Sequence, residues 1–267
     1  MGNALILGRY IPGNSILHRL DPRNKLLIAF YFIGLTFFAN NWSTNGLLFI
    51  LIGVGVWLAK LPIRFFLSGL RPLLWLILFT VLMQLIFTRG GHVFWQWGWL
   101  SISEVGLVNG AVVFCRFVLI IFISTLLTLT TPPLALADGI AALIKPLRWL
   151  HFPVDEVALM LGLALRFVPT LMDETTRIMD AQRSRGVDFG AGNLFQQMKA
   201  LVPLLIPQFV SSFKRADELG TAMEARGYQG PSQRSHYRIL QFHWADAALV
   251  CLMLGFTLIF IAVRQFN

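Results

Sequence analysis

AQRSRG at 181–186 and AMEARG at 222–227 are two copies of one pattern, Ala-x-x-x-Arg-Gly. Each copy closes a long run that is compatible with a helix. Glycine suits the position just after a helix, and a terminal arginine complements the negative end of the helix dipole. Each copy therefore predicts a helix end. Two copies on successive helices also favour a second interpretation, in which Arg185 and Arg226 are matched docking tips for a partner protein.

The composition predicts an integral membrane protein. Of the 267 residues, 56% are hydrophobic and only 13% are charged, against roughly a quarter charged in a soluble domain. So few charges cannot cover a soluble surface, and 23 Phe and 8 Trp suit contact with lipid and its interface. Cys115 and Cys251 lie in apolar runs and indicate no disulfide framework. The N-terminus shows no signal-peptide pattern.

Apolar runs predict an all-α fold with about five transmembrane helices. The first four form a membrane domain over 1–131, at about 25–42, 45–60, 72–88 and 105–131, and the last is at 244–267. In LDPRNKLL at 20–27, Asp21-Pro22 predicts the start of the first helix, with Asp21 as its cap. Arg116 lies within the fourth span, where an arginine must face protein or water.

The distribution of Lys and Arg predicts the topology. Four lie in residues 1–25, three in the connector LPIRFFLSGLRP and its flank at 60–71, and twelve in 131–243. The opposite side receives only Arg89 and Arg264. This bias places the N-terminus and the 132–243 segment in the cytoplasm. It also explains the net charge of +9 without nucleic acid as a partner.

The 132–243 segment predicts a cytoplasmic domain of three helices. They run at about 133–150, 153–185 and 194–226. Asp155 and Glu156 fall in the first turn of the second helix, where the helix dipole favours them. Pro169, and the pair at 203 and 207, should kink the two long helices.

Both long helices are apolar in their first halves. VALMLGLALRFVPTLM at 157–172 is interrupted only by Arg166, and a helical stripe on the third helix comprises Phe195, Met198, Val202, Leu205, Phe209 and Phe213. Such a surface needs an apolar partner. The two helices could bury these faces against each other, or the faces could contact a membrane-embedded protein.

The chain resembles a known family in its motifs and in their order. These motifs are LDPRNKLL, the stretch PLRWLHFPVDEVALMLGLALRFVP at 146–169 and the two Arg-Gly endings. This family is the transmembrane (T) component of energy-coupling factor transporters. These are prokaryotic, plasma-membrane importers of vitamins and metal ions that resemble ATP-binding-cassette transporters. The resemblance covers essentially the whole chain, and the doubled Arg-Gly ending is its specific part.

The resemblance implies a non-catalytic subunit with no cofactor and no metal. It implies two cytoplasmic ATPase subunits as partners, docked at Ser184, Arg185, Gly186, Ala225, Arg226 and Gly227. It also implies a membrane-embedded, substrate-binding S component. The residues expected to contact it are Leu161, Leu163, Arg166, Phe167, Phe195, Val202, Leu205, Phe209 and Phe213.

Two other functions compete with the coupling role. The permease of a conventional importer would line its own substrate path, but the spans offer few polar candidates, such as Gln84 and Arg116. A membrane enzyme would need convergent catalytic groups, and the five His residues are scattered with no metal-ligand spacing. No Gly-Lys dipeptide occurs, so the chain has no Walker A sequence and ATP must be handled by partners.

Overall fold

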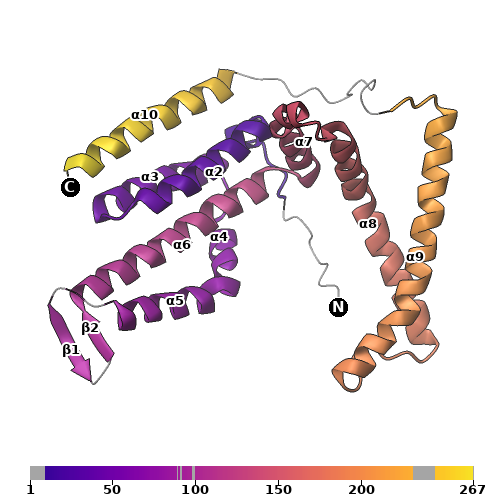
Figure 1. Cartoon of the computed structure of the whole chain (residues 1–267), viewed down its shortest axis with the longest axis horizontal. Helices are drawn as coiled ribbons and strands as arrows, with labels where there is room; N and C mark the ends of the chain where they lie inside the picture. The colour runs from indigo at the N-terminus through magenta and orange to yellow at the C-terminus, as the bar shows by residue number, and fades with distance from the viewer. Residues whose placement is uncertain (1–9, 89, 91, 98–99, 231–243, 267) are drawn as a thin grey trace. The chain divides into compact units, whose positions relative to one another are not determined.

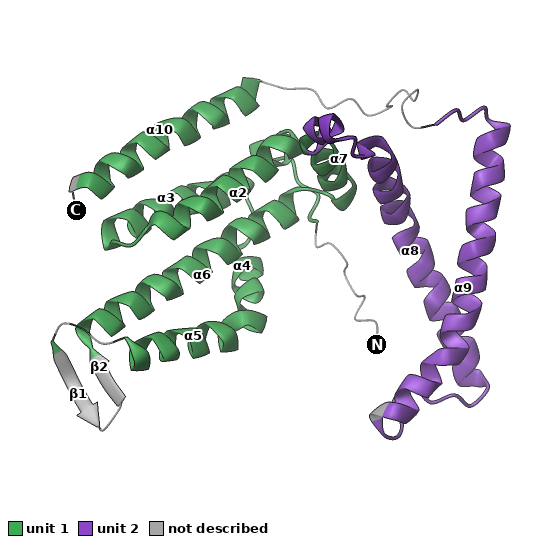
Figure 2. Cartoon of the chain, viewed as in Figure 1, with its two compact units in different colours: residues 1–143, 240–267 green, residues 144–239 purple. Residues whose placement is uncertain are grey.

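The chain divides into two compact units, which Figure 2 colours separately. The computed structural model describes residues 10–88, 90, 92–97, 100–230 and 244–266. The first unit comprises 1–143 and 240–267, and the second comprises 144–239. The boundary at 143/144 lies after the predicted domain boundary at 131/132. The assignment of 132–243 to the cytoplasm stays a prediction.

The first unit is built almost entirely of helices (Figure 1). They are α1 (Ile16–Arg19), α2 (Pro22–Phe38), α3 (Trp42–Ala59), α4 (Ile63–Leu70), the 3-10 helix η1 (Arg71–Leu73), α5 (Leu74–Phe87), α6 (Glu104–Thr130), α7 (Pro133–Leu143) and α10 (Trp244–Phe266). The prediction of an all-α membrane protein is confirmed, with one addition. Strands β1 (Val93–Trp97) and β2 (Leu100–Ser103) form an antiparallel pair in the aromatic-rich segment between α5 and α6.

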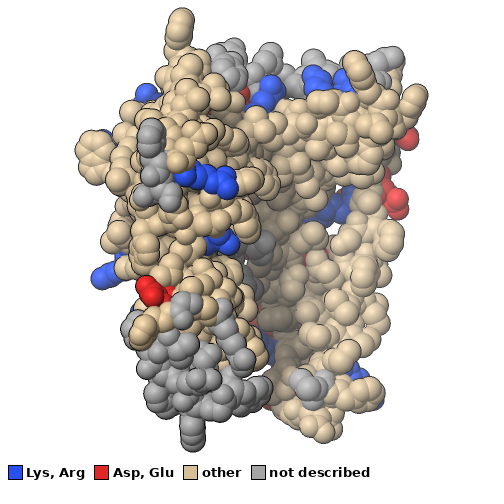
Figure 3. Space-filling model, turned by 60° about the vertical axis from the view of Figure 1, so that its left-hand side comes forward, with Lys and Arg blue, Asp and Glu red and all other residues tan. Residues whose placement is uncertain are grey.

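In the part of the chain that the structure describes, four helical segments are long and apolar enough to cross a membrane. They are Trp42–Ala59, Ile63–Phe87, Glu104–Thr130 and Trp244–Gln265. Their exposed side chains are largely apolar, and most of the face in Figure 3 is formed by uncharged residues. Helix α2, the first predicted span, has 17 residues and carries Arg23 and Lys25 in its first turn. Its crossing of the membrane therefore stays a prediction.

Helix α6 organises the first unit, because α2, α3, α4 and α5 all contact it. The buried core joins four helices, with Phe32 from α2, Leu48 from α3, Leu119 from α6 and Phe260 from α10. Each of these side chains is at most 2% exposed. Helix α7 packs on α2, which explains why it belongs to this unit and not to the long helices that follow it.

The LDPRNKLL stretch forms a buried polar cluster at the start of α2. Asp21 caps α2 by accepting from the N–H of Arg23 at 2.9 Å, as the sequence predicts. The N–H of Asp21 donates to the Oδ1 of the fully buried Asp246 at 2.9 Å. Lys25 donates from Nζ to the carbonyl oxygen of Thr130 at 3.2 Å and to Oγ1 of Thr131 at 3.3 Å. The cluster thus joins the beginnings of α2 and α10 to the end of α6.

Arg116 pairs within the helix bundle. Its Nε donates to the carbonyl oxygen of Thr36 at 3.2 Å, and its Nη2 donates to Oδ1 of Asn40 at 3.3 Å. Its guanidinium also lies 5.3 Å from the ring centre of Phe37. The arginine therefore satisfies the open carbonyl end of α2, where the helix dipole favours a cation.

The second unit contains the 3-10 helix η2 (Lys145–Leu150) and the long helices α8 (Val154–Ser184) and α9 (Leu194–Ala225). The prediction of one helix over 133–150 is wrong, because α7 ends at Leu143 and η2 follows. Pro146 has no N–H to donate, and it disfavours the helical conformation of the residue before it. Helix α9 changes direction along its length (Figure 1), as Pro203 and Pro207 in its interior predict.

Candidate functional site

Both long helices end in the same backbone conformation. Arg185 is the C-cap residue directly after α8, and Gly186 follows with φ of +84°. Arg226 and Gly227 (φ of +74°) repeat the arrangement after α9. The N–H of each glycine donates to the carbonyl oxygen three residues earlier, at 2.9 Å in both cases. The next N–H reaches back five residues, at 3.0 Å in both cases. These bonds define a Schellman motif, so the predicted helix ends are confirmed.

The two arginine side chains at these ends are exposed. Within the described part of the chain, neither guanidinium has a carboxylate at ion-pair distance. The neighbouring Arg183 differs, because it pairs with Asp180 at 3.4 Å and lies 6.0 Å from the ring centre of Phe189. A Cβ added at Gly186 or Gly227 would meet nothing within 4 Å. Each end therefore presents a cation beside open space.

Helices α8 and α9 run antiparallel and meet through polar side chains. Glu174 of α8 accepts from Nη2 of Arg215 at 2.9 Å and also from Oγ of Ser211. Farther along α8, Nε2 of Gln182 donates to the carbonyl oxygen of Pro203 at 3.4 Å. Glu174 thus pairs with Arg215, whereas Gln182, later in α8, pairs with Pro203, earlier in α9. The two helices therefore run in opposite directions.

This direction separates the two arginine tips. Arg185 follows Gln182 by one turn, so it lies near Pro203 in the first part of α9. Arg226 lies at the other end of α9, up to roughly 35 Å from Pro203 at about 1.5 Å per residue. The two tips cannot enter one binding site. They can engage two separate sites on a partner or on two partners.

The apolar stripe of α9 is exposed within its unit. The exposed fractions are 80% for Phe195, 62% for Phe209 and 70% for Phe213, and Val202 and Leu205 are each nearly half exposed. Contact with α8 uses a different set of α9 positions, which includes Gln208, Ser211 and Arg215. Because α8 does not cover the stripe, the interpretation that the two helices bury these faces against each other is wrong for α9.

The predicted α8 residues of this surface differ in exposure. Leu161, Leu163 and Phe167 are half-buried, and Arg166 is exposed. Phe167 lies beneath the guanidinium of Arg215, with 5.8 Å between the guanidinium carbon and the ring centre. Phe167 therefore contributes to the α8–α9 crossing.

Sequence reasoning did not identify Glu174, Ser211 and Arg215 as a connected group. Each is a polar residue in the polar second half of its helix, so the sequence predicts that each is exposed to solvent. The available signal was the exposure pattern that follows from helical periodicity, since 208, 211 and 215 share one face of α9. Glu174, the partner of Ser211 and Arg215, is 37 and 41 positions away from them in the chain. No local sequence pattern specifies this pairing.

Known proteins resemble this chain over nearly its whole length. The profile of the CbiQ family, described as cobalt transport protein, matches residues 13–237. A relative from Lacticaseibacillus paracasei, named energy-coupling factor transporter transmembrane protein EcfT, is 62% identical over 260 residues, covering 96% of this chain and 98% of the relative. Proteins of the same type from Listeria monocytogenes and Bacillus subtilis are 53% and 49% identical. The Listeria alignment covers 96% of this chain and 97% of the relative, and the Bacillus alignment covers 94% of each.

Proposed function

Because this chain belongs to the CbiQ family, as an EcfT-type transmembrane component of an energy-coupling factor transporter, we propose that it couples two cytoplasmic ATPase subunits to a membrane-embedded S component. The chain is a non-enzymatic transporter subunit, and ATP hydrolysis belongs to its partners. The imported substrate is a vitamin or another micronutrient that the S component binds.

Docking of the ATPases is assigned to Ser184-Arg185-Gly186 and Ala225-Arg226-Gly227. Arginine presents a planar, permanently charged fork that pairs with a carboxylate through two hydrogen bonds. Each glycine leaves the space beside the arginine open, which lets a partner backbone approach closely. The observation that carries the proposal is the repetition of one exposed, unpaired arginine end at two well-separated places, as two copies of an ATPase domain require.

Capture of the S component is assigned to the exposed apolar stripe of α9 and the first half of α8. An apolar surface of this length is stable when a membrane-embedded protein covers it. Phe195, Phe209 and Phe213 supply large rings at the exposed positions. When the ATPases move the two arginine tips, the α8–α9 crossing carries that displacement to the stripe and reorients the S component.

The test of ATPase docking reverses the charge of both tips. Arg185→Glu combined with Arg226→Glu should abolish co-purification of the ATPase subunits, because each glutamate would face the acidic partner that the arginine binds. Uptake of the radiolabelled vitamin into vesicles should fall to the background rate. Vesicles that lack the S component should also show only background uptake, whereas a permease would transport without it.

A matched control makes the same charge change away from the tips. Arg177 and Lys214 are exposed on α8 and α9, and Arg177→Glu combined with Lys214→Glu should leave ATPase co-purification intact. Unchanged uptake in the Arg185/Arg226 double variant would refute the docking assignment. Equal loss in the control variant would show that the effect is one of overall charge.

A further inference from the structure

The connector between α3 and α5 carries a surface that the proposed coupling does not use. It contains the amphipathic helix α4 and three cations, Lys60, Arg64 and Arg71. One face of α4 is fixed to α6, since Phe66 is fully buried with its ring centre 5.4 Å from that of Phe122. The other face is free, with Ile63 61% and Leu67 54% exposed.

An apolar groove lies beside this helix, and a cation is part of its lining. Its volume is about 450 Å³, and it is lined by Phe49, Ile52, Gly53, Val56, Trp57, Lys60, Leu61, Ile63 and Phe122. Lys60 is the only charged residue of the lining. Trp57 is 77% exposed beside it, at the end of a helix that can cross the membrane.

The three cations at this surface lie in a long stretch of sequence without acidic residues. The sequence contains no Asp or Glu between Pro22 and Ser103. In the parts of the chain that the structure describes, no carboxylate lies at ion-pair distance from any of the three, and all are exposed. Lys60 also ends α3 with φ of +55°, a left-handed position that glycine fills at lower cost.

We propose that this groove binds an anionic phospholipid. The acyl chain lies along Phe49, Val56 and Trp57, and the phosphate is held by Lys60 and Arg64. Long basic side chains at the end of a membrane span extend toward the headgroup region, and clustered cations there attract anionic lipid. The cytoplasmic leaflet is the site if the charge-derived topology of the proposed function holds.

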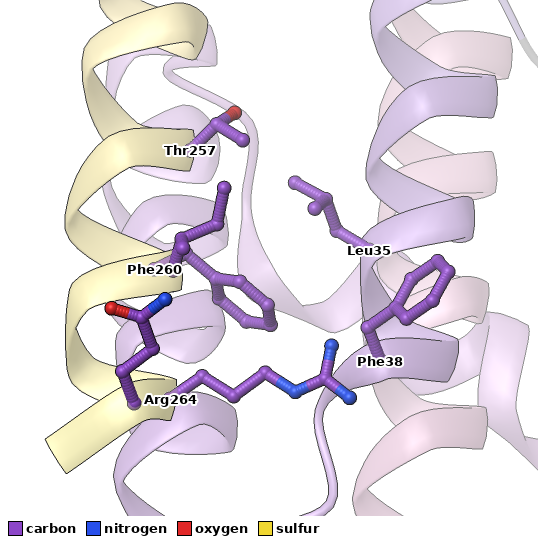
Figure 4. A pocket seen from close by; sticks show the side chains of 7 residues that line it. Leu35, Phe38, Thr257, Phe260 and Arg264 are labelled. Carbon is purple, nitrogen blue, oxygen red and sulfur yellow. The ribbon is translucent and has the colours of Figure 1, made fainter.

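A second apolar groove provides a contrast. It lies between α2 and α10 and has a similar volume, about 450 Å³. Figure 4 shows Arg264 reaching from α10 toward Phe38 of α2, and its guanidinium lies 5.6 Å from that ring centre. Arg264 is thus engaged with a ring, whereas in the described chain Lys60 and Arg64 have no such contact.

Trp57 offers a direct probe of the site. The full chain is reconstituted without other subunits in phosphatidylcholine vesicles that contain brominated phosphatidylglycerol or brominated phosphatidylcholine. The quenching of Trp57 is the difference between the parent chain and Trp57→Phe. We expect brominated phosphatidylglycerol to reach half-maximal quenching at a lower mole fraction than brominated phosphatidylcholine. Each of the two cations that hold the phosphate should lower this mole fraction about fivefold.

Lys60→Gln combined with Arg64→Gln should abolish this preference, and Lys60→Arg combined with Arg64→Lys should retain it and shows that the surface still folds. Arg264→Gln removes a cation from the end of another span and should change nothing at Trp57. Equal quenching by the two brominated lipids would overturn the proposal, as would absence of quenching by either. Since no ATPase or S component is present, a failure of the coupling proposal cannot produce either result.

Discussion

Arg185 and Arg226 each stand one residue before a glycine that the backbone requires. Gly186 and Gly227 hold φ of +84° and +74°, and an added Cβ would meet no neighbouring atom. The glycines are therefore needed for their conformation and not for space within the chain. The helix-ending and docking interpretations are compatible, because the Schellman motif fixes where the arginine lies and leaves its side chain unpaired.

Gly186→Ala should loosen the end of α8. A left-handed conformation costs an L-residue about 1–2 kcal/mol, and Asn tolerates it better than Ala. We expect amide exchange at Val187, whose N–H donates to Gln182, to accelerate about tenfold in Gly186→Ala. Hydrogen exchange followed by mass spectrometry measures this change.

Gly186→Asn is the matched variant and should show a smaller acceleration. Exchange at Tyr228, the equivalent position after α9, should stay unchanged in both variants because the second Schellman motif is intact. Equal protection in Gly186→Ala and the parent chain would contradict the conformational role of the glycine.

At the scale of helices, the decisive feature is that α8 and α9 contact each other through polar groups. Helical periodicity predicts the stripe on α9, and the two Arg-Gly pairs predict where α8 and α9 end. Periodicity could not show which face meets α8. That choice depends on Glu174, which takes hydrogen bonds from Ser211 and Arg215 and leaves the stripe exposed.

Phe209→Ser should weaken capture of the S component without unfolding the chain. The Phe209 side chain is 62% exposed, so its replacement leaves no cavity in the chain itself. Co-purification of a tagged S component in detergent should fall at least about tenfold, the loss expected when a large ring leaves an apolar interface. The melting temperature of the isolated chain should change little.

Leu204→Ser provides the opposite case on the same helix. Leu204 is 8% exposed, so this substitution buries a hydroxyl and leaves a void, and the melting temperature should fall. Full S-component co-purification with Phe209→Ser would remove the stripe from the proposed interface.

At the scale of the whole molecule, the distribution of cations makes the topology testable. Asn14 is exposed before α2, and Trp42 is 61% exposed at the opposite end, where α3 begins. In a chain with Cys115→Ala and Cys251→Ala, a membrane-impermeant maleimide on intact cells should label Trp42→Cys and spare Asn14→Cys. Permeabilised cells should show labelling at both positions, because both side chains are exposed. The reverse pattern in intact cells would place the N-terminus outside.

The sequence by itself determined the membrane class, the helical fold and the two Arg-Gly helix ends. These features depend on composition and on interactions within a few residues, such as the bond from Val187 to Gln182. Only the tertiary structure decided that LDPRNKLL is joined to Asp246, that α7 packs on α2, and that the arginine tips lie at opposite ends of a polar crossing. The physical reason is separation along the chain. Asp21 and Asp246 are 225 positions apart, and no local preference specifies which distant partner a polar side chain meets.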